Sequence, residues 1–247
     1  MTQEKTKDEK EKALRQTVQN ILRNRRLSTI QRFVYDCSEY DPLTIMRELG
    51  RQLYGARFVI DDDNRFVYEN AVRWLIGYQF EAIDPNHVGC TIQGDPMRGL
   101  YIAGNCGSGK SVLLQLLAAI AGYYHTEYEF DGRKIFLCWS EKRADELCND
   151  FVLNGADVVA NAKMADILCL NDLGSEPAEQ LYMGNRVNII RQIIEARGDR
   201  QGQITVITSN YPMLHPFIKE RYGDRVVSRL QGMCNYFELK GKDRRAC

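Results

Sequence analysis

The chain has 247 residues, 44% of them hydrophobic, which is enough for one large α/β domain with a small appendage. Its 33 lysines and arginines balance its 33 aspartates and glutamates, so a net charge of zero excludes a global attraction to nucleic acid. No run approaches ~18 uninterrupted apolar residues, and the eight cysteines lack C-x-x-C spacing. These features argue against a membrane segment and a disulfide scaffold, and they predict a cytoplasmic protein.

The N-terminal quarter of the chain is predicted to be a small helical region. Apolar side chains recur at helical spacing at Leu14, Val18 and Ile21, which indicates one amphipathic helix over residues 2–32. Residues 33–63 mix short apolar clusters with glycine and proline and end in an acidic turn. We therefore expect an N-terminal helical region, residues 1–63, that binds a partner, and a main domain over residues 64–247.

Two segments carry an excess of lysine and arginine, namely roughly the first thirty residues and residues 219–245. A basic segment can contact the phosphates of a nucleic acid, or it can be an ordinary solvated helix face. The sequence leaves both interpretations open.

The main domain alternates strands with helices. After a helix over residues 66–78 and a loop over 84–99, strands are expected at residues 100–103, 135–139, 167–170, 204–208 and 236–239. Helices are expected at residues 110–124, 141–153 and 186–196. The strand at 135–139 is a continuous apolar run, as a strand covered on both faces should be. The order predicts a three-layer α/β/α domain around a parallel sheet.

A phosphate-binding motif follows the first of these strands and opens the next helix. Its residues are Gly104, Asn105, Cys106, Gly107, Ser108, Gly109, Lys110 and Ser111, which fit the P-loop pattern G-x-x-x-x-G-K-[ST]. The glycines let backbone N–H groups curl around a β-phosphate at a helix N-terminus. Lys110 would reach the β- and γ-phosphates of ATP, and the Ser111 hydroxyl would ligate Mg²⁺. The alternative is a glycine-rich turn without a ligand.

Polar residues at the ends of two further strands supply the metal and hydrolysis side of the predicted site. Asn171 and Asp172 end the strand that begins at residue 167, and Glu176 follows four residues after Asp172. We expect Asn171 and Asp172 beside the Mg²⁺ and Glu176 beside the attacking water. Asn210 ends the next strand, where its amide could sense the γ-phosphate or form an ordinary turn.

The order of these motifs resembles the AAA+ ATPases, and within them the DnaC-like helicase loaders and IstB-like transposition helpers. The resemblance covers about residues 66–245 and adds two segments, box VII at residues 222–230 and a sensor 2 segment at 239–245. It implies a homo-oligomer in which Arg229, or else Arg225, reaches the ATP of a neighbouring subunit. It also implies that Arg245 contacts the nucleotide and that the partners are DNA and a helicase or transposase client. The other possibility for Arg229 is a surface arginine paired with an acid of its own subunit.

Asn171 departs from the resembled pattern, which has an aspartate at this position. An amide brings no negative charge to a hydrated Mg²⁺, so the sequence predicts slow basal turnover with a raised Mg²⁺ requirement. In the competing interpretation, Asp172 takes over the metal role and Glu176 orients the water. An ATP-gated scaffold with little hydrolysis is therefore a second hypothesis. A P-loop kinase is a third, but no insert resembling its arginine-bearing lid is present.

Overall fold

The computed structural model describes residues 2–24, 30–37, 39–87, 89–182, 184–241 and 243. The first element, α1 (Thr2–Asn24), carries apolar side chains that face solvent: Leu14 is 63% exposed, Val18 45% and Ile21 50%. The helix is thus amphipathic, as the spacing predicted, but residues 30–32 of the predicted span form a strand instead. The apolar face of the helix does not join the core of the domain. Among the described residues, no helix combines the length and the apolar character that crossing a membrane requires.

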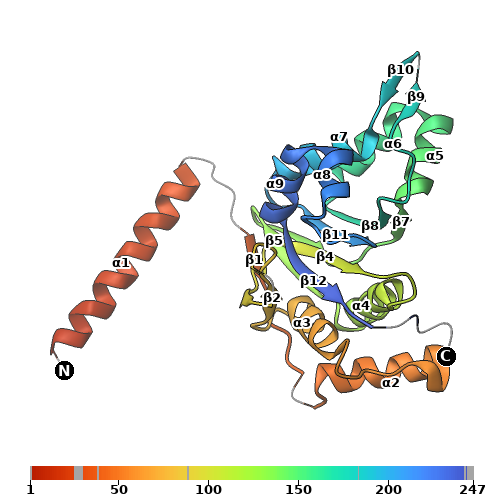
Figure 1. Cartoon of the computed structure of the whole chain (residues 1–247). Helices are drawn as coiled ribbons and strands as arrows, with labels where there is room; N and C mark the ends of the chain where they lie inside the picture. The colour runs from red at the N-terminus through yellow and green to blue at the C-terminus, as the bar shows by residue number, and fades with distance from the viewer. Residues whose placement is uncertain are drawn as a thin grey trace.

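A seven-stranded sheet runs through the centre of the described part of the chain (Figure 1). Its spatial order is β3 (Thr91–Gln93), β2 (Glu81–Ile83), β12 (Cys234–Leu239), β4 (Gly99–Gly104), β11 (Ile204–Ser209), β8 (Ile167–Leu173) and β7 (Glu141–Arg143). The strands from β12 to β7 are parallel, whereas β2 and β3 are antiparallel additions at one edge. Consequently the carboxyl ends of β4, β11 and β8 meet at one edge of the sheet.

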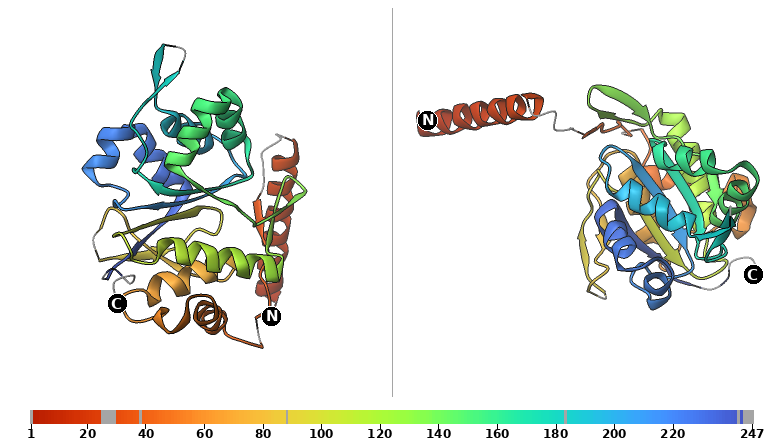
Figure 2. Two further views of the ribbon diagram at one scale, coloured as in Figure 1. Left: turned by 90° about the vertical axis from the view of Figure 1, so that its right-hand side faces the viewer. Right: turned by 90° about the horizontal axis from the view of Figure 1, so that it is seen from above.

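Helices cover both faces of this sheet, as Figures 1 and 2 show. One face carries α2 (Pro42–Tyr54), α3 (Arg65–Leu75) and α4 (Lys110–Tyr124). The other face carries α5 (Ala144–Asn154), α6 (Ala156–Met164), α7 (Ile189–Gly198), α8 (Pro216–Tyr222) and α9 (Asp224–Met233). Side chains of β4 alternate between the two layers, because Leu100 and Ile102 join the first core and Tyr101 and Ala103 the second. The predicted three-layer α/β/α fold is confirmed.

The region before residue 64 also packs into this domain. Met46 of α2 is fully buried in the core beneath the sheet, together with Phe58 and Ile60. The short 3₁₀ helix η1 (Gly55–Arg57) links α2 to that segment. Residues 42–60 are therefore part of the wall of the main domain, and α1 is the element of this region whose apolar face stays uncovered.

The apolar run at 135–139 is not a strand of the central sheet, contrary to the prediction. Here β6 (Arg133–Phe136) forms an antiparallel sheet with β5 (Glu127–Phe130) and β1 (Ile30–Arg32). In β6 only Ile135 is buried, and Phe136 is 40% exposed. The run resembled a strand covered on both faces because Leu137 and Trp139, which follow the strand, are also buried. A short apolar run cannot distinguish these arrangements.

Two helices begin later than predicted, because a short strand occupies the expected first turn. Residues 141–143 form β7, and α5 begins at Ala144. Residues 185–187 form β10, which pairs with β9 (Gln180–Tyr182), and Asn188 then caps α7 by accepting a hydrogen bond from the Arg191 N–H at 2.9 Å. The first of these differences affects the site, as described below.

Gly99, the first residue of β4, offers a test of this packing. A β-carbon at Gly99 would lie 1.9 Å from the backbone oxygen of Thr205 in β11, so we expect Gly99→Ala to lower stability by about 3 kcal/mol. The matched control is Gly122→Ala in α4, where an added β-carbon would meet no atom within 4 Å apart from its own helix backbone. That change should raise stability by roughly 0.5–1 kcal/mol, because alanine is the better helix former. Thermal unfolding of both variants checks the pair, and equal melting temperatures would contradict the close approach of β4 to β11.

Candidate functional site

The P-loop connects the end of β4 at Gly104 to the start of α4 at Lys110, as the sequence predicted. Gly107 and Gly109 have φ angles of +75° and +99°, which L side chains rarely adopt. A β-carbon on Gly107 would also lie 1.9 Å from a carboxylate oxygen of Asp243. The loop can therefore curl only with glycine at these positions, and its backbone lies at the positive end of a 15-residue helix.

Lys110 is buried, and its ammonium group links the P-loop to the end of β11. Its Nζ donates to the backbone oxygens of Gly104 at 2.6 Å and Asn105 at 3.0 Å, and to the Asn210 side-chain oxygen at 2.8 Å. These acceptors are neutral, whereas a polyphosphate would offer the ammonium charged oxygens. Asn210 follows β11, which lies between β4 and β8, so the topology brings this amide to the P-loop as predicted.

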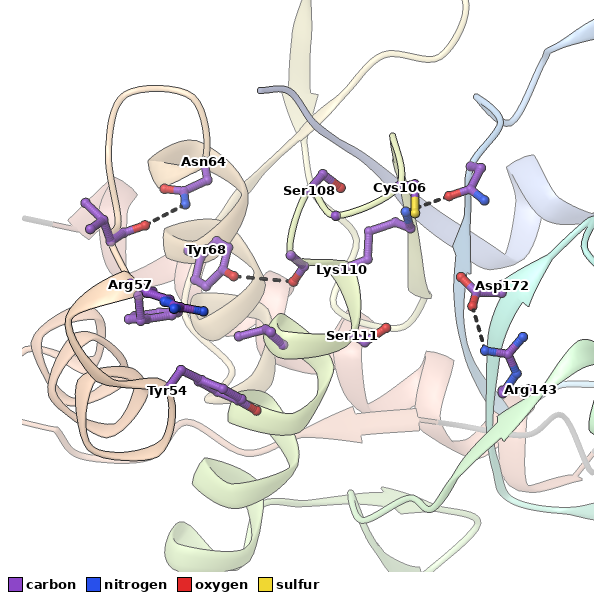
Figure 3. A pocket seen from close by; sticks show the side chains of 16 residues that line it. Tyr54, Arg57, Asn64, Tyr68, Cys106, Ser108, Lys110, Ser111, Arg143 and Asp172 are labelled. Carbon is purple, nitrogen blue, oxygen red and sulfur yellow. Dashed lines mark hydrogen bonds and ion pairs between the residues drawn. The ribbon is translucent and has the colours of Figure 1, made fainter. Parts of the chain in front are cut away.

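A cavity of about 540 Å³ opens in front of the P-loop, a volume typical of small-molecule sites. Figure 3 shows the loop and the start of α4 between two walls, with residues of the 54–68 region on one side and Asp172 with Arg143 on the other. The lining residues are Tyr54, Arg57, Phe58, Val59, Asn64, Tyr68, Cys106, Gly107, Ser108, Gly109, Lys110, Ser111, Val112, Arg143, Asp172 and Asn210.

One wall of this cavity is aromatic. The rings of Phe58 and Tyr68 lie with their centroids 5.9 Å apart, and Tyr54 packs against Phe58 at 6.3 Å. Tyr68 also donates a hydrogen bond to the backbone oxygen of Gly109 at 3.4 Å, which ties the wall to the P-loop. An aromatic surface next to a phosphate-binding loop is suited to a planar base.

The opposite wall depends on a bulge in β8. Ile207 of β11 pairs with Leu170, but Ser209 pairs with Leu173, so β8 contains one extra residue between these positions. Asp172 lies in this bulge and has a φ of +57°, a left-handed conformation that aspartate tolerates better than most residues. A regular strand would turn Asn171 and Asp172 to opposite faces of the sheet. The bulge instead lets Asp172 line the cavity beside Asn171.

The amide of Asn171 points its nitrogen at the P-loop serine. Its Nδ2 lies 3.2 Å from the Ser111 hydroxyl oxygen and 3.3 Å from a carboxylate oxygen of Glu141, while its oxygen accepts a hydrogen bond from Thr208. A carboxylate can only accept, and the Thr208 hydroxyl already accepts from the Asp172 N–H at 2.9 Å. The Glu141 carboxylate therefore requires the amide nitrogen on its side, and the Thr208 hydroxyl is free to donate to the amide oxygen. Burial raises the pKa of Glu141, and the negative charge of Asp172 raises it further.

Asp172 pairs with Arg143 at 3.4 Å across the mouth of the cavity. Arg143 ends β7, directly opposite Asn171 in the register, and also pairs with Asp145 at 3.0 Å. Within the described residues, no group of three or more His, Cys, Asp and Glu side chains is placed to hold a metal ion by itself. The donors near Ser111 are a hydroxyl and a few carboxylates. They fit Mg²⁺ bound together with phosphates, because Mg²⁺ uses few protein ligands and keeps several waters.

Glu176 lies apart from this group. Its carboxylate is buried, accepts from the Gly174 N–H at 2.9 Å and pairs with Arg221 at 3.2 Å. Tyr222 also donates to it, and burial raises the pKa of this tyrosine, which keeps the phenol protonated. Glu176 is not among the residues that line the cavity. In this structure its contacts hold α8 to the loop after β8, and within the described ranges it forms no hydrogen bond or ion pair with Asp172 or a P-loop residue.

Arg229 is on α9, away from the P-loop of its own chain. It pairs with Asp199 at the end of α7, as does Arg225 at 3.3 Å. This is the intrasubunit pairing that the sequence left open as the alternative for Arg229. Arg245 lies outside the described residues. Asp243 is described, and one of its carboxylate oxygens lies 1.9 Å from where a β-carbon of Gly107 would be.

Three solved structures are similar in fold to this chain. A protein provisionally assigned as a primosome component of Streptococcus pyogenes serotype M3 is 17% identical with a TM-score of 0.49, over 74% of this chain and 83% of its own. The DnaC helicase loader is 18% identical with a TM-score of 0.47, over 74% of this chain and 93% of its own. AMPPCP-bound DnaA from Aquifex aeolicus is 19% identical with a TM-score of 0.45, over 76% of this chain and 50% of DnaA.

No protein-family model matches the chain, and no curated protein matches it in sequence. The resemblance to DnaC-like AAA+ ATPases stays a prediction from the motifs, since all three likenesses have TM-scores below 0.5. At these identities the likeness does not extend to activity, which has to be argued from the site itself.

The sequence motifs missed the aromatic wall and the contribution of β7. Tyr54, Phe58 and Tyr68 belong to no motif and reach the cavity only because α2 and α3 pack beside α4. Glu141 and Arg143 were hidden in a segment predicted as the first turn of a helix. The charge pattern around Arg143 gave no signal that could distinguish a cavity residue from a solvated one.

We predict that Lys110→Ala lowers the affinity for a fluorescent ATP analogue by about 100-fold or more, because the variant lacks the ammonium group that lies within the cradle. Lys134→Ala is the matched control, since Lys134 is an exposed lysine on β6 paired with Glu127 at 2.6 Å. Fluorescence titration measures both affinities. Undiminished binding by Lys110→Ala would rule out the P-loop as the nucleotide site.

Proposed function

We propose that this chain is an ATP-binding and ATP-hydrolysing AAA+ assembly factor that works as a homo-oligomer and acts on DNA, as helicase loaders do. The observation that carries the proposal is the P-loop at the mouth of a cavity where Lys110, Ser111, Asp172 and Asn210 converge. Hydroxyl, carboxylate, ammonium and amide groups in this arrangement can bind a nucleoside triphosphate with Mg²⁺.

In this proposal the triphosphate lies along the P-loop and the base lies against the aromatic wall. The buried Ser108 hydroxyl has no hydrogen-bond partner among the described residues, which suits a loop whose polar groups await phosphate oxygens. Lys110 would exchange neutral acceptors for β- and γ-phosphate oxygens, which frees the Asn210 amide to sense the γ-phosphate. Ser111 and Asp172 would hold the hydrated Mg²⁺, which neutralises charge that develops on the transferred phosphoryl group.

Oligomerisation would complete the site. Among the described residues two arginines line the cavity: Arg143, which is paired with Asp172 and Asp145, and Arg57, which lies on the wall opposite Asp172. Arg229 is 36% exposed and is held by a single carboxylate residue, Asp199. A neighbouring subunit's phosphates could draw it away, because Arg225 would remain to pair with Asp199. We therefore keep Arg229 as the proposed residue that acts between subunits.

The N-terminal helix is the proposed partner-binding element. Its exposed apolar side chains at Leu14, Val18 and Ile21 form a stripe of the kind that amphipathic helices lay into a groove of another protein. The resemblance implies a helicase or transposase as that partner, and the basic segments are the proposed contacts with DNA.

A specific observation favours a second function, that of an ATP-gated scaffold with little hydrolysis. Asn171 presents an amide nitrogen to Ser111, and Glu176 is tied to Arg221 and Tyr222. With neither side chain offering a carboxylate to the attacking water, nucleotide binding could set the oligomeric state while turnover stays slow.

Turnover measured against protein concentration, with and without single-stranded DNA, tests the proposal. A site shared between subunits predicts a rate per subunit that rises steeply with concentration and responds to DNA. Oligomer formation that depends on ATP without measurable turnover would favour the scaffold. An appreciable rate that is flat in concentration and insensitive to DNA would contradict both.

We predict that Arg229→Ala lowers turnover by about 100-fold, while the ATP affinity of the isolated subunit changes less than about twofold, because a guanidinium supplied by a neighbour acts mainly in the transition state. The matched control is Arg191→Ala, an exposed arginine on α7 paired with Glu195 at 3.1 Å. Steady-state turnover and nucleotide titration separate the two effects.

A mixing experiment tests whether Arg229 acts on the site of a neighbouring subunit. Lys110→Ala subunits lack the cradle cation but keep Arg229, whereas Arg229→Ala subunits have the reverse defect. Mixed oligomers contain interfaces with one intact copy of each residue, so activity should return when the two inactive proteins are combined. No recovery in assembled mixtures would show that Arg229 does not act between subunits.

A further inference from the structure

The metal side of the proposed site lacks a carboxylate at the position next to the P-loop serine. Asn171 stands there, and its nitrogen rather than its oxygen faces Ser111. An N–H donor cannot ligate a cation, and it cannot accept a hydrogen bond from a metal-bound water. As oriented in this structure, Asn171 therefore contributes no ligand to Mg²⁺.

A carboxylate from another strand lies directly beside this position. Glu141 begins β7, the edge strand that pairs in parallel with β8, and its register partner is Cys169. Residues 169 and 171 face the same side of β8, toward α4, so Glu141 projects to the face of the sheet on which Ser111 opens α4. Ser111 and Glu141 both lie within 3.3 Å of the Asn171 nitrogen.

The electrostatic surroundings of Glu141 fit a cation ligand. It is half-buried and accepts a hydrogen bond from Asn171, a neutral group. Within the described ranges it forms no ion pair with lysine or arginine, whereas Asp172 next to it pairs with Arg143. A half-buried carboxylate beside a second acid is costly unless a cation or further donors compensate it.

We propose that Glu141 supplies the carboxylate that position 171 lacks, so that Ser111, Glu141 and Asp172 together hold the hydrated Mg²⁺ of the bound nucleotide. This inference rests on the proposed ATP-binding function and extends it to a residue outside the P-loop and the strand that follows it. Asn171 then has a positioning role, because its amide holds the Glu141 carboxylate toward Ser111. The Mg²⁺ requirement should then be close to that of a site with an aspartate at 171. It should not be raised, contrary to what the sequence predicted.

The test measures metal binding directly. Mn²⁺ binding to the protein with a non-hydrolysable ATP analogue is followed by electron paramagnetic resonance, and affinity for a fluorescent ATP analogue is titrated with Mg²⁺ and in its absence. Glu141→Gln keeps the shape of the side chain and removes its charge, so Mg²⁺ half-saturation should rise about tenfold, a change of about 1.4 kcal/mol. Nucleotide affinity without metal should stay unchanged. Glu129→Gln on β5, a residue that does not line the cavity, is the matched control.

Moving the charge provides the decisive comparison. Asn171→Asp alone should change Mg²⁺ half-saturation little, because the carboxylate it adds next to Ser111 replaces the ligand role of Glu141, which loses the amide that positions it. Glu141→Gln combined with Asn171→Asp should return it to within about threefold of the unmodified protein, a difference of about 0.7 kcal/mol. Rescue of this kind is not expected if Glu141 only stabilises the fold, and thermal unfolding of the variants monitors that role separately.

Three results would overturn the inference: unchanged Mn²⁺ binding by Glu141→Gln, a tenfold gain by Asn171→Asp alone, or a loss in Glu141→Gln that Asn171→Asp does not restore. Failure of the proposed function itself is distinguishable, because in that case the unmodified protein would bind neither the ATP analogue nor Mn²⁺ with it.

Discussion

The parallel alignment of β4, β11 and β8 is the constraint on which the site depends. Gly99 allows β4 to approach β11 more closely than any side chain would permit, and the three strands then end at the same edge. From these ends come the P-loop, Asn210 and the pair Asn171 and Asp172. Because each group follows directly from a buried strand, its position is set by the backbone of the sheet rather than by flexible loops.

Charge balance explains the arrangement on the metal side. The Asp172 bulge brings one carboxylate to the cavity, and the parallel pairing of β7 with β8 brings the Glu141 carboxylate to the same place. Arg143, two residues along β7, compensates Asp172 in this structure. The edge strand β7 thus contributes the Glu141 carboxylate and the Arg143 guanidinium, whereas the adjoining strand β8 carries the neutral amide of Asn171. The free energy of such a cluster depends on what it binds, since a divalent cation changes the balance of all three charges.

Residues that form the site differ from residues that support it in the number of partners that hold their charged groups. Glu176 has a donor or a cation at each carboxylate oxygen and is buried against α8, so it stabilises the loop after β8. Arg229 is partly exposed and, among the described residues, pairs with the carboxylate of Asp199, which Arg225 also contacts. Two charged residues that look equally catalytic in a motif therefore differ in how firmly their own subunit holds them.

The sequence by itself determined the elements whose signals are local. The P-loop, the helix from Lys110 to Tyr124 and the strands at 100–103 and 204–208 follow from glycine spacing, a lysine at a helix start and apolar runs. Asn210 could be placed beside Lys110 because parallel strands end together. The three-layer architecture followed from the alternation of strands and helices.

Only the tertiary structure decided the features that join distant segments. The run at 135–139 has the composition of a central strand, but the second face of β6 stays uncovered because it pairs with β5 in a separate antiparallel sheet. The short strand at Glu141–Arg143 forms because the edge of β8 offers backbone partners, a gain that no local propensity of these charged residues predicts. The bulge at Asp172 is visible only in the register with β11. Glu141, Asn171 and Ser111 thus meet through strand pairing, which acts over 30 to 60 residues of chain and leaves no mark in the spacing of a motif.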